Sequence, residues 1–242
     1  MSPFSIFYYL VLSFIYILAI PYLIFKSRNS KYRQAIPAKF FLKDNVPFKE
    51  NGIWFHSCSM GETKAIKPLI DNYLENANIS VITNTGFEEA KKISPNVRYL
   101  PFEIFLPFWV NKQKVLVVME AELWYLLFLL AKKKGAKTLL INARISDKSY
   151  KSYKRFSFFY KRIFQNIDKV FAQSEVDKYR LEELGATNIE VIGNIKLAQL
   201  PKVNVNLEKP KQVIITAAST HENEEKLILD AFKKEQGKLI IV

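Results

Sequence analysis

The sequence is poor in the residues that form disulfides and metal sites. Its 242 residues include a single cysteine, Cys58, and two histidines, His56 and His221. A single cysteine excludes an intramolecular disulfide, and neither the Cys/His spacing nor any Asp-x-Asp pair suits a metal ion. We therefore expect chemistry that needs no metal.

Glycine is also scarce, and its seven residues form no G-x-G-x-x-G. The usual dinucleotide fingerprint is thus missing, and we expect no cofactor. Gly135, Gly185 and Gly237 each lie between an amphipathic run and the next apolar run, where a helix ends best on a residue with positive φ. Gly61 and Gly86 lie at expected strand-to-helix turns.

Charge is absent from residues 4–25, a run of 22 positions. As a helix this run would measure about 33 Å, which is bilayer length. No basic residue precedes it and no small-x-small cleavage site follows it, so a cleaved signal peptide is disfavoured. Residues 1–25 are therefore predicted to be a membrane-anchor helix, spanning or re-entrant. Its four tyrosines and Pro21 leave two alternatives open, a helix lying in the membrane interface and a buried core helix.

Negative charge is outnumbered, because 36 Lys and Arg face 23 Asp and Glu and the net charge is +13. Such a balance favours anionic partners: nucleic acid, phospholipid headgroups or a phosphorylated substrate. Residues 26–50 form a basic juxtamembrane segment, with seven Lys/Arg against Asp44 and Glu50. By the positive-inside rule, we expect the domain that follows to lie on the cytoplasmic side of the membrane, next to anionic lipid.

A second basic strip, residues 148–164, interleaves cations with aromatic side chains. Nucleic-acid binding and membrane docking both use such strips, and the apolar N-terminus favours the membrane. The aromatics are also compatible with the core-facing side of a helix. We expect no nucleic-acid partner.

Past residue 50, short apolar runs alternate with longer amphipathic runs. This alternation predicts an α/β fold for residues 51–196, with a parallel sheet covered by helices on both faces. The expected strands are residues 53–55, 80–83, 115–119, 138–141, 169–172 and 189–192.

A polar, proline-marked stretch, residues 197–211, reads as a linker. After it come an expected strand at 212–217, a helix at 221–234 and a strand at 238–242. Two strands and a helix cannot enclose a core. We therefore expect residues 212–242 to be only the start of a second α/β domain of a longer protein, unless an oligomer completes the sheet.

The best candidate for a catalytic group is Glu62, which follows the small residues 57–61 at the end of the first expected strand. Ligands of open parallel sheets gather at the carboxyl ends of the strands. The helix macrodipole and free amides should hold this carboxylate ionised, so that it can accept a proton. The alternative is a purely structural first-turn carboxylate.

Two further strand ends carry candidate binding residues. Glu120 and Glu122 follow the strand at 115–119, where one could bind substrate hydroxyls while the other caps the next helix. Arg144 follows the strand at 138–141 and could hold a phosphate or carboxylate in its fork, or be an ordinary surface arginine.

Two last candidate segments flank the linker. Asn194 and Lys196 lie just before it, and Ser219, Thr220 and His221 follow the first strand after it. Both segments lie where facing domains would close on a ligand. Ser219 or Thr220 is also a good N-cap for a helix beginning near His221, with Glu222 or Glu225 as its capping partner.

Six motifs in the same order and spacing resemble the Kdo (3-deoxy-D-manno-octulosonic acid) transferases of lipopolysaccharide assembly. They are HSCSMGET at 56–63, MEAELW at 119–124, INARIS at 141–146, AQSEVDKYRLEELGA at 172–186, GNIK at 193–196 and AASTHENEE at 217–225. The resemblance implies a GT-B glycosyltransferase with an N-terminal acceptor domain and a C-terminal donor domain. It further implies inverting transfer of Kdo from CMP-Kdo to a lipid A precursor.

The resemblance also implies residue roles. Glu62 would be the general base. The acceptor side would be formed by Ser59, Gly61, Glu120, Glu122 and Arg144, and the donor side or cleft by Asn194, Lys196, Ser219, Thr220 and His221.

The chain departs from the family pattern in three places. Leu197 and Ala198 stand where the family usually has Phe-Asp, and ENEE at 222–225 replaces EGEE. The Pro-Arg-His stretch and the Gly-rich donor loops of the family would follow residue 242. We therefore expect this chain to be inactive alone. The competing hypothesis is a non-catalytic membrane-surface lipid-binding module with the acceptor-domain fold.

Overall fold

The computed structural model describes residues 2–198 and 211–242. The chain divides into two compact units, Met1–Leu200 and Pro201–Val242, and each is considered by itself. Most of the expected linker, residues 199–210, lies outside the described residues.

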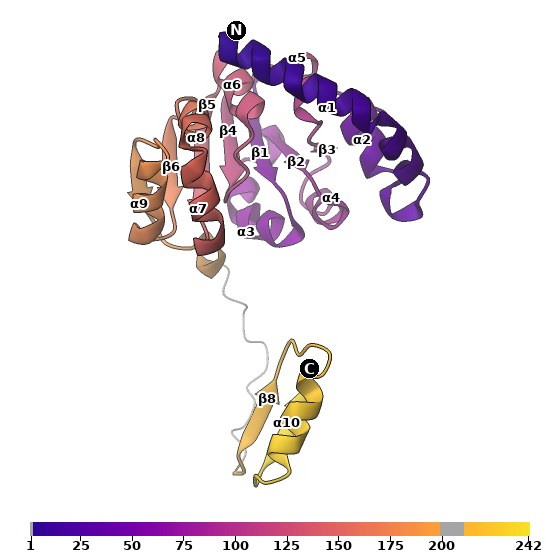
Figure 1. Ribbon diagram of the computed structural model, residues 1–242, viewed down its shortest axis with the longest axis vertical. Helices are drawn as coiled ribbons and strands as arrows, with labels where there is room; N and C mark the ends of the chain where they lie inside the picture. The colour runs from indigo at the N-terminus through magenta and orange to yellow at the C-terminus, as the bar shows by residue number, and fades with distance from the viewer. Residues whose placement is uncertain (1, 199–210) are drawn as a thin grey trace. The chain divides into compact units, whose positions relative to one another are not determined.

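The first unit is built on a seven-stranded sheet whose neighbouring strands are all parallel, in the order β3-β2-β1-β4-β5-β6-β7 (Figure 1). The strands are β1 (Ile53–Ser57), β2 (Ala77–Val81), β3 (Val97–Tyr99), β4 (Val115–Met119), β5 (Lys137–Ala143), β6 (Lys169–Ala172) and β7 (Ile189–Val191). This is a Rossmann-like α/β sheet, and the predicted fold class is confirmed.

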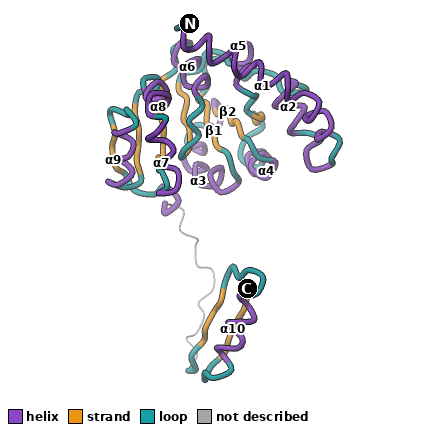
Figure 2. Tube along the Cα trace, viewed as in Figure 1, coloured by secondary structure: helices purple, strands orange, loops and turns teal. Residues whose placement is uncertain are grey.

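Helices connect these strands (Figure 2). The helices of the first unit are α1 (Pro3–Ser27), α2 (Ala35–Phe41), α3 (Met60–Asp71), α4 (Asn84–Lys91), α5 (Leu106–Trp109), α6 (Tyr125–Lys133), α7 (Asp147–Arg155), α8 (Ser157–Phe164) and α9 (Glu175–Glu183), with short 3-10 turns η1 (Ser30–Tyr32), η2 (Leu74–Asn76), η3 (Glu103–Phe105) and η4 (Ile195–Ala198).

Each face of the sheet has its own core, because successive strand residues point to opposite sides. On β1, Trp54 packs into a core with α5, α6, α8 and α9, whereas Phe55 packs into a second core with α2, α3 and α4. On β4, Val118 and Met119 divide in the same way. The prediction of helices on both faces is therefore confirmed.

The predicted boundaries were wrong in places. The strand β3 was missed, because its three residues include Arg98 and the run is too short to show an apolar pattern. The strand β2 begins at Ala77 and ends at Val81, earlier than the predicted 80–83. The predicted positive φ values of Gly135, Gly185 and Gly237 are confirmed at 87°, 91° and 148°.

The apolar N-terminal run forms α1. It is the one helix in the described part of the chain that is long and apolar enough to cross a membrane by length and composition. Of its residues only Ser5 and Leu23 are buried, so the alternative of a core helix was wrong. The helix lies along the outside of the unit, from α6 toward α2 (Figure 1).

The second unit contains β8 (Ile214–Ala217), α10 (Glu224–Phe232) and β9 (Lys238–Ile241), with the two strands paired in parallel. The predicted cap of its helix was wrong. The N-cap is Asn223, at φ 74°, and it makes no side-chain cap bond. Instead, Thr220 Oγ1 donates to Glu225 Oε1 at 2.9 Å and the His221 N–H donates to Glu224 Oε2 at 2.8 Å. These two carboxylates draw residues 220–223 into a turn, and the helix starts later than expected.

Candidate active site

The candidate site lies at the carboxyl ends of β1 and β4. These strands are neighbours, and the strand order reverses between them, since β2 and β3 extend the sheet to one side and β5 to β7 to the other. Open α/β sheets bind ligands in the crevice at such a switch point. Glu62 follows β1, and Glu120 and Glu122 follow β4, so the topology brings the three predicted carboxylates to one region.

The turn from β1 into α3 holds Glu62 with its own residues. Ser59 is the N-cap of α3, and its side chain accepts a hydrogen bond from the Glu62 N–H at 3.3 Å. In return, Glu62 Oε1 accepts the Ser59 hydroxyl at 3.0 Å and Oε2 accepts the Cys58 N–H at 2.7 Å. This is a reciprocal arrangement of the capping-box type. It fixes both oxygens of the carboxylate at the strand-to-helix corner.

Opposing influences act on the pKa of Glu62. Burial raises the pKa of this carboxyl, and the charges of Glu120 and Glu122 raise it further, whereas the Cys58 and Ser59 donors lower it. The side chain is nearly removed from solvent, with 9% of the residue exposed. Burial therefore works against the ionised form that the sequence predicts, while the Cys58 and Ser59 donors work for it.

The start of α4 presses against the same corner. Thr83, the N-cap of α4, bonds the Cys58 carbonyl through both its N–H, at 3.1 Å, and its hydroxyl, at 2.8 Å. A Cβ placed on Gly86 would lie 3.2 Å from that carbonyl oxygen and 3.3 Å from the Ser59 carbonyl carbon. Glycine at this position therefore lets two helix starts approach each other closely.

On the β4 side, Glu122 has a different environment from Glu62. Its Oε2 accepts the Trp124 Nε1–H at 2.7 Å and lies 3.9 Å from His56 Nε2, which is too far for a hydrogen bond. Burial alone would raise the pKa of Glu122, but His56, Trp124 and Cys58 together outweigh it and lower the pKa. The cluster therefore holds one carboxyl with a raised pKa and one with a lowered pKa.

Neither predicted carboxylate caps α6. That helix is capped by Glu103, a buried residue from η3, whose Oε1 accepts the Leu126 N–H at 2.6 Å. The expectation that Glu120 or Glu122 would cap the following helix was wrong, because the cap is supplied by a distant segment. Both glutamates are consequently left for other contacts.

Glu120 is joined to the segment at 193–196. Its Oε1 accepts Lys196 Nζ at 2.6 Å and Asn142 Nδ2 at 3.3 Å. Asn142 is fully buried at the end of β5, and its Oδ1 also accepts the Ile195 N–H at 3.1 Å. Lys196 thus lies beside Glu120. Asn194 is on the same turn, where its Oδ1 accepts the Lys196 N–H at 3.0 Å.

Two buried residues of this region were not singled out from the sequence. Asn142 was passed over in favour of Arg144, and His56 was noted only for its metal-binding spacing. His56 Nδ1 lies 2.8 Å from Ser80 Oγ, and its Nε2 has no hydrogen-bond partner among the described residues. The signal was an amide and an imidazole at the ends of apolar strands, where a buried polar group needs partners.

The other predicted residues are less constrained. Arg144 directly follows β5, is exposed, and makes no hydrogen bond or ion pair with the described residues. Ser219, Thr220 and His221 belong to the second unit. Among the described residues, no group of three or more His, Cys, Asp and Glu side chains is arranged to hold a metal ion.

Comparison with known proteins identifies the family of this chain. The family model of 3-deoxy-D-manno-octulosonic-acid transferase (kdotransferase) matches residues 28–199. The chain belongs to the Kdo transferase family. The matched range includes every candidate residue of the first unit and excludes Ser219, Thr220 and His221.

Curated relatives agree with this family. A 3-deoxy-D-manno-octulosonic acid transferase of Rickettsia bellii is 34% identical over 209 residues, which cover 78% of this chain and 49% of the relative. One of Chlamydia pneumoniae is 30% identical over 223 residues, covering 85% of this chain and 51% of the relative. A bifunctional glycosyltransferase/methyltransferase of Fusobacterium nucleatum subsp. nucleatum is 32% identical over 217 residues, covering 80% of this chain and 34% of the relative. The chain thus spans about half or less of the length of these relatives.

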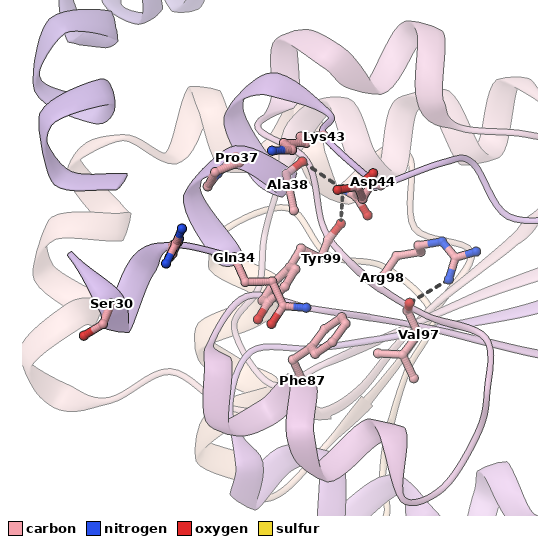
Figure 3. A pocket seen from close by; sticks show the side chains of 12 residues that line it. Ser30, Gln34, Pro37, Ala38, Lys43, Asp44, Phe87, Val97, Arg98 and Tyr99 are labelled. Atoms are coloured by element: carbon pink, nitrogen blue, oxygen red, sulfur yellow. Dashed lines mark hydrogen bonds between the residues drawn. The ribbon is translucent and has the colours of Figure 1, made fainter. Parts of the chain in front are cut away.

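A separate hollow of about 350 Å³ lies in the same Kdo transferase unit, between the η1–α2 segment and the β3–α4 side (Figure 3). Its lining includes Arg33, Lys43 and Arg98, together with one carboxylate, Asp44. The basic juxtamembrane segment is therefore packed against the unit. Its residues Ala35, Ile36 and Ala38 are buried, and two of its cations, Arg33 and Lys43, line the pocket.

Proposed function

We propose that the full-length protein transfers Kdo from CMP-Kdo to a lipid A precursor during lipopolysaccharide assembly, at the cytoplasmic face of the inner membrane. The observation that carries this proposal is Glu62. In a chain of the Kdo transferase family, this buried carboxylate lies at the switch point of the sheet with both oxygens fixed by its own turn. This position suits a base that acts on an acceptor bound at the strand ends.

In the proposed reaction, Glu62 takes the proton of an acceptor hydroxyl while that oxygen attacks the anomeric carbon of Kdo. A new carbon–oxygen bond forms as the bond to the phosphate oxygen breaks, CMP departs, and the anomeric centre inverts. General base catalysis is most effective when the pKa of the base approaches the working pH. The raised pKa of Glu62 moves it in that direction.

The remaining residues are assigned by their place around this base. Ser59, Gly61, Glu120, Glu122 and Arg144 would contact the acceptor, with Arg144 the exposed cation for an anionic group. Lys196 and Asn194 would lie toward the donor, where a cation stabilises the charge of the departing phosphate. The reaction as proposed uses no metal ion and no organic cofactor.

The second unit is proposed to begin the donor-binding domain, with Ser219, Thr220 and His221 facing the cleft. Support comes from its exposed apolar side chains, among them Ile214, Ile215 and Leu227, which a larger α/β domain would cover. The chain by itself is accordingly proposed to bind acceptor and anionic lipid without transferring sugar. We propose no nucleic-acid partner.

The decisive experiment replaces Glu62 in the full-length gene product. Glu62→Gln keeps the size of the side chain but cannot take a proton, so the rate of Kdo transfer should fall about 100- to 10,000-fold. Acceptor affinity should stay within a few fold. The assay follows radiolabelled CMP-Kdo onto the lipid A precursor, with Glu75→Gln, an exposed glutamate of η2, as the matched control. Wild-type turnover by Glu62→Gln would refute the assignment of the base.

A further inference from the structure

The helix α1 has two opposite faces with different surroundings. At 100° per residue, Ser5, Tyr9, Tyr16 and Leu23 fall on one side, and Phe7, Phe14 and Phe25 fall about 180° away. Ser5 and Leu23 on the first side are buried, whereas Phe7, Phe14 and Phe25 are 65%, 64% and 72% exposed. The helix is apolar all round, yet one side only is covered by protein.

The covered side is bonded to the unit along its length. Ser5 Oγ lies 2.7 Å from Tyr125 Oη, and Tyr9 donates its hydroxyl to the Ile104 carbonyl at 3.0 Å. Further along, Tyr16 donates to the Phe40 carbonyl at 2.6 Å. Ser5 and Tyr16 are about 16 Å apart along the axis. The helix therefore lies on the surface of the unit and does not project from it.

These contacts are incompatible with an upright helix. If α1 stood across a bilayer, the protein bonded to it would enter the hydrocarbon, including Glu103, which accepts the Tyr8 hydroxyl, and Arg162, whose Cζ lies 4.4 Å from the Phe4 ring centroid. Ionisable groups at that depth are costly. A helix lying flat keeps them on the aqueous side. It places in lipid only its exposed side with Phe7, Phe14 and Phe25, the outward stripe.

The outward face continues onto a neighbouring segment. An apolar groove of about 380 Å³ separates α1 from the α7–α8 region and is lined by Phe4, Phe7 and Val11 on one side and Phe156, Phe158 and Phe159 on the other. Phe158 is 56% exposed. The basic and aromatic strip at 148–164 thus shares an apolar surface with α1.

Cations occur on both flanks of this surface. No Asp or Glu occurs before Asp44, and the cations Lys26, Arg28 and Lys31 follow the outward stripe directly. On the other flank, Arg155 and Lys161 are exposed, and Lys161 lines a hollow with Phe158, Glu182 and Glu183. An apolar stripe bordered by cations complements an anionic bilayer surface.

We propose that α1 lies in the plane of an anionic bilayer, and that its outward stripe together with Phe156 and Phe158 forms the membrane-docking surface, with the groove taking a lipid acyl chain. This inference rests on the proposed membrane location but not on the proposed reaction. Binding can therefore be tested without donor or acceptor, and loss of transfer activity would leave the result unchanged.

Depth measurement separates the flat helix from the upright one. In the complete chain with Cys58→Ser, a fluorophore is attached to Phe7→Cys, Phe14→Cys or Phe25→Cys, and quenching by lipids brominated at graded depths is measured in vesicles of 70% phosphatidylcholine and 30% phosphatidylglycerol. The flat helix predicts the same shallow depth at all three positions. A deep Phe14 label between shallow ends would overturn the proposal. So would labels that lipid does not quench because a second copy of the chain covers them.

Vesicle binding gives a second, independent measurement. Phe7→Ser and Phe158→Ser should each weaken sedimentation with the same vesicles about tenfold, since each removes a phenyl ring from lipid. Leu74→Ser, on an exposed side chain of η2 away from this surface, is the matched control and should bind as the wild type does. Unchanged binding by both Phe variants would overturn the proposal.

Discussion

The two strand-to-helix connections that form the site are supported in opposite ways. The turn from β1 into α3 closes on itself, since Ser59 and Glu62 cap the helix and each other. The loop from β4 into α6 depends on distant parts of the chain, with Glu103 capping its helix and Lys196 holding Glu120. A local turn can hold one group in a fixed geometry, whereas an assembled loop can follow movements of its partners.

This difference suits the different roles proposed for Glu62 and Glu120. A catalytic base gains from a fixed position, because small misplacements cost rate. A binding group that contacts both acceptor and cleft gains from a partner that can adjust, and the Lys196 side chain, 42% exposed, is such a partner. Four measurements test whether the two connections differ in rigidity.

The largest effect is expected from shortening each carboxylate by one methylene in the full-length protein. Glu62→Asp should lower kcat about 100-fold, because the rigid turn cannot follow the withdrawn carboxylate. Glu120→Asp should lower it only a few fold, because the flexible Lys196 can follow. Steady-state transfer kinetics measure both, and equal losses would remove the distinction between the two connections.

The next effect concerns the residue that joins Glu120 to the turn at 193–196. Asn142→Ala should lower the free energy of unfolding by about 3 kcal/mol, for two reasons. It leaves the Ile195 N–H without its acceptor. It also places alanine at φ 53°, a left-handed conformation that asparagine tolerates better than alanine does. Asn142→Gly should recover about 1 kcal/mol of this by relieving the backbone. Urea unfolding in detergent measures both variants. If glycine is no better than alanine, backbone conformation plays no part.

Glu103, which caps α6 from a distant segment, predicts that the free energy of unfolding depends on pH. Burial raises the pKa of Glu103 to about 6, although its hydrogen bonds from Tyr8 and α6 oppose the shift. The folded state therefore binds this proton more tightly than the unfolded state does. The resulting stability is complete below the unfolded pKa near 4.5 and is lost as pH rises through about 6, a difference of about 2 kcal/mol.

Glu103→Gln should remove this loss, which is read from unfolding free energies at pH 4 and pH 8. Glu75→Gln on the surface serves as the control. A variant with the same pH dependence as the wild type would contradict the assignment to Glu103.

The smallest effect is expected for the ion pair itself. A double-mutant cycle with Glu120→Gln and Lys196→Met should give a coupling of about 0.5 kcal/mol in unfolding free energy, since Lys196 is partly exposed and screened by water. The coupling should shrink in high salt. A coupling of several kcal/mol would show that this pair is as rigid as the β1–α3 turn.

Much of the fold was predictable from the sequence, because buried parallel strands are apolar runs separated by amphipathic helices. The strand at residues 115–119 was placed at its observed bounds, since Val115–Met119 is apolar throughout. The strand β3 could not be found in this way, because Arg98 interrupts it and only pairing with β2 defines it.

The site was predictable where its contacts are local. The placement of Glu62 at a strand-to-helix turn followed from the small residues 57–61 after the first apolar run, and in the structure Ser59 and Cys58 bond its carboxylate there. The cap of α6 could not be predicted, because Glu103 reaches Leu126 from another part of the chain. The roles of His56 and Asn142 likewise depend on neighbours in the sheet rather than in the sequence. The shift in the pKa of Glu62 depends on burial, which only the packed structure reveals.

The close approach at Gly86 couples the start of α4 to the turn between β1 and α3. A methyl group there would push against the main chain of Cys58 and Ser59, the two residues whose N–H and hydroxyl orient the proposed base. A shift at the start of α4, which is not among the proposed substrate contacts, would therefore slow catalysis while the fold stays intact. Enzyme engineers who reshape acceptor preference in this chain should leave that small gap empty.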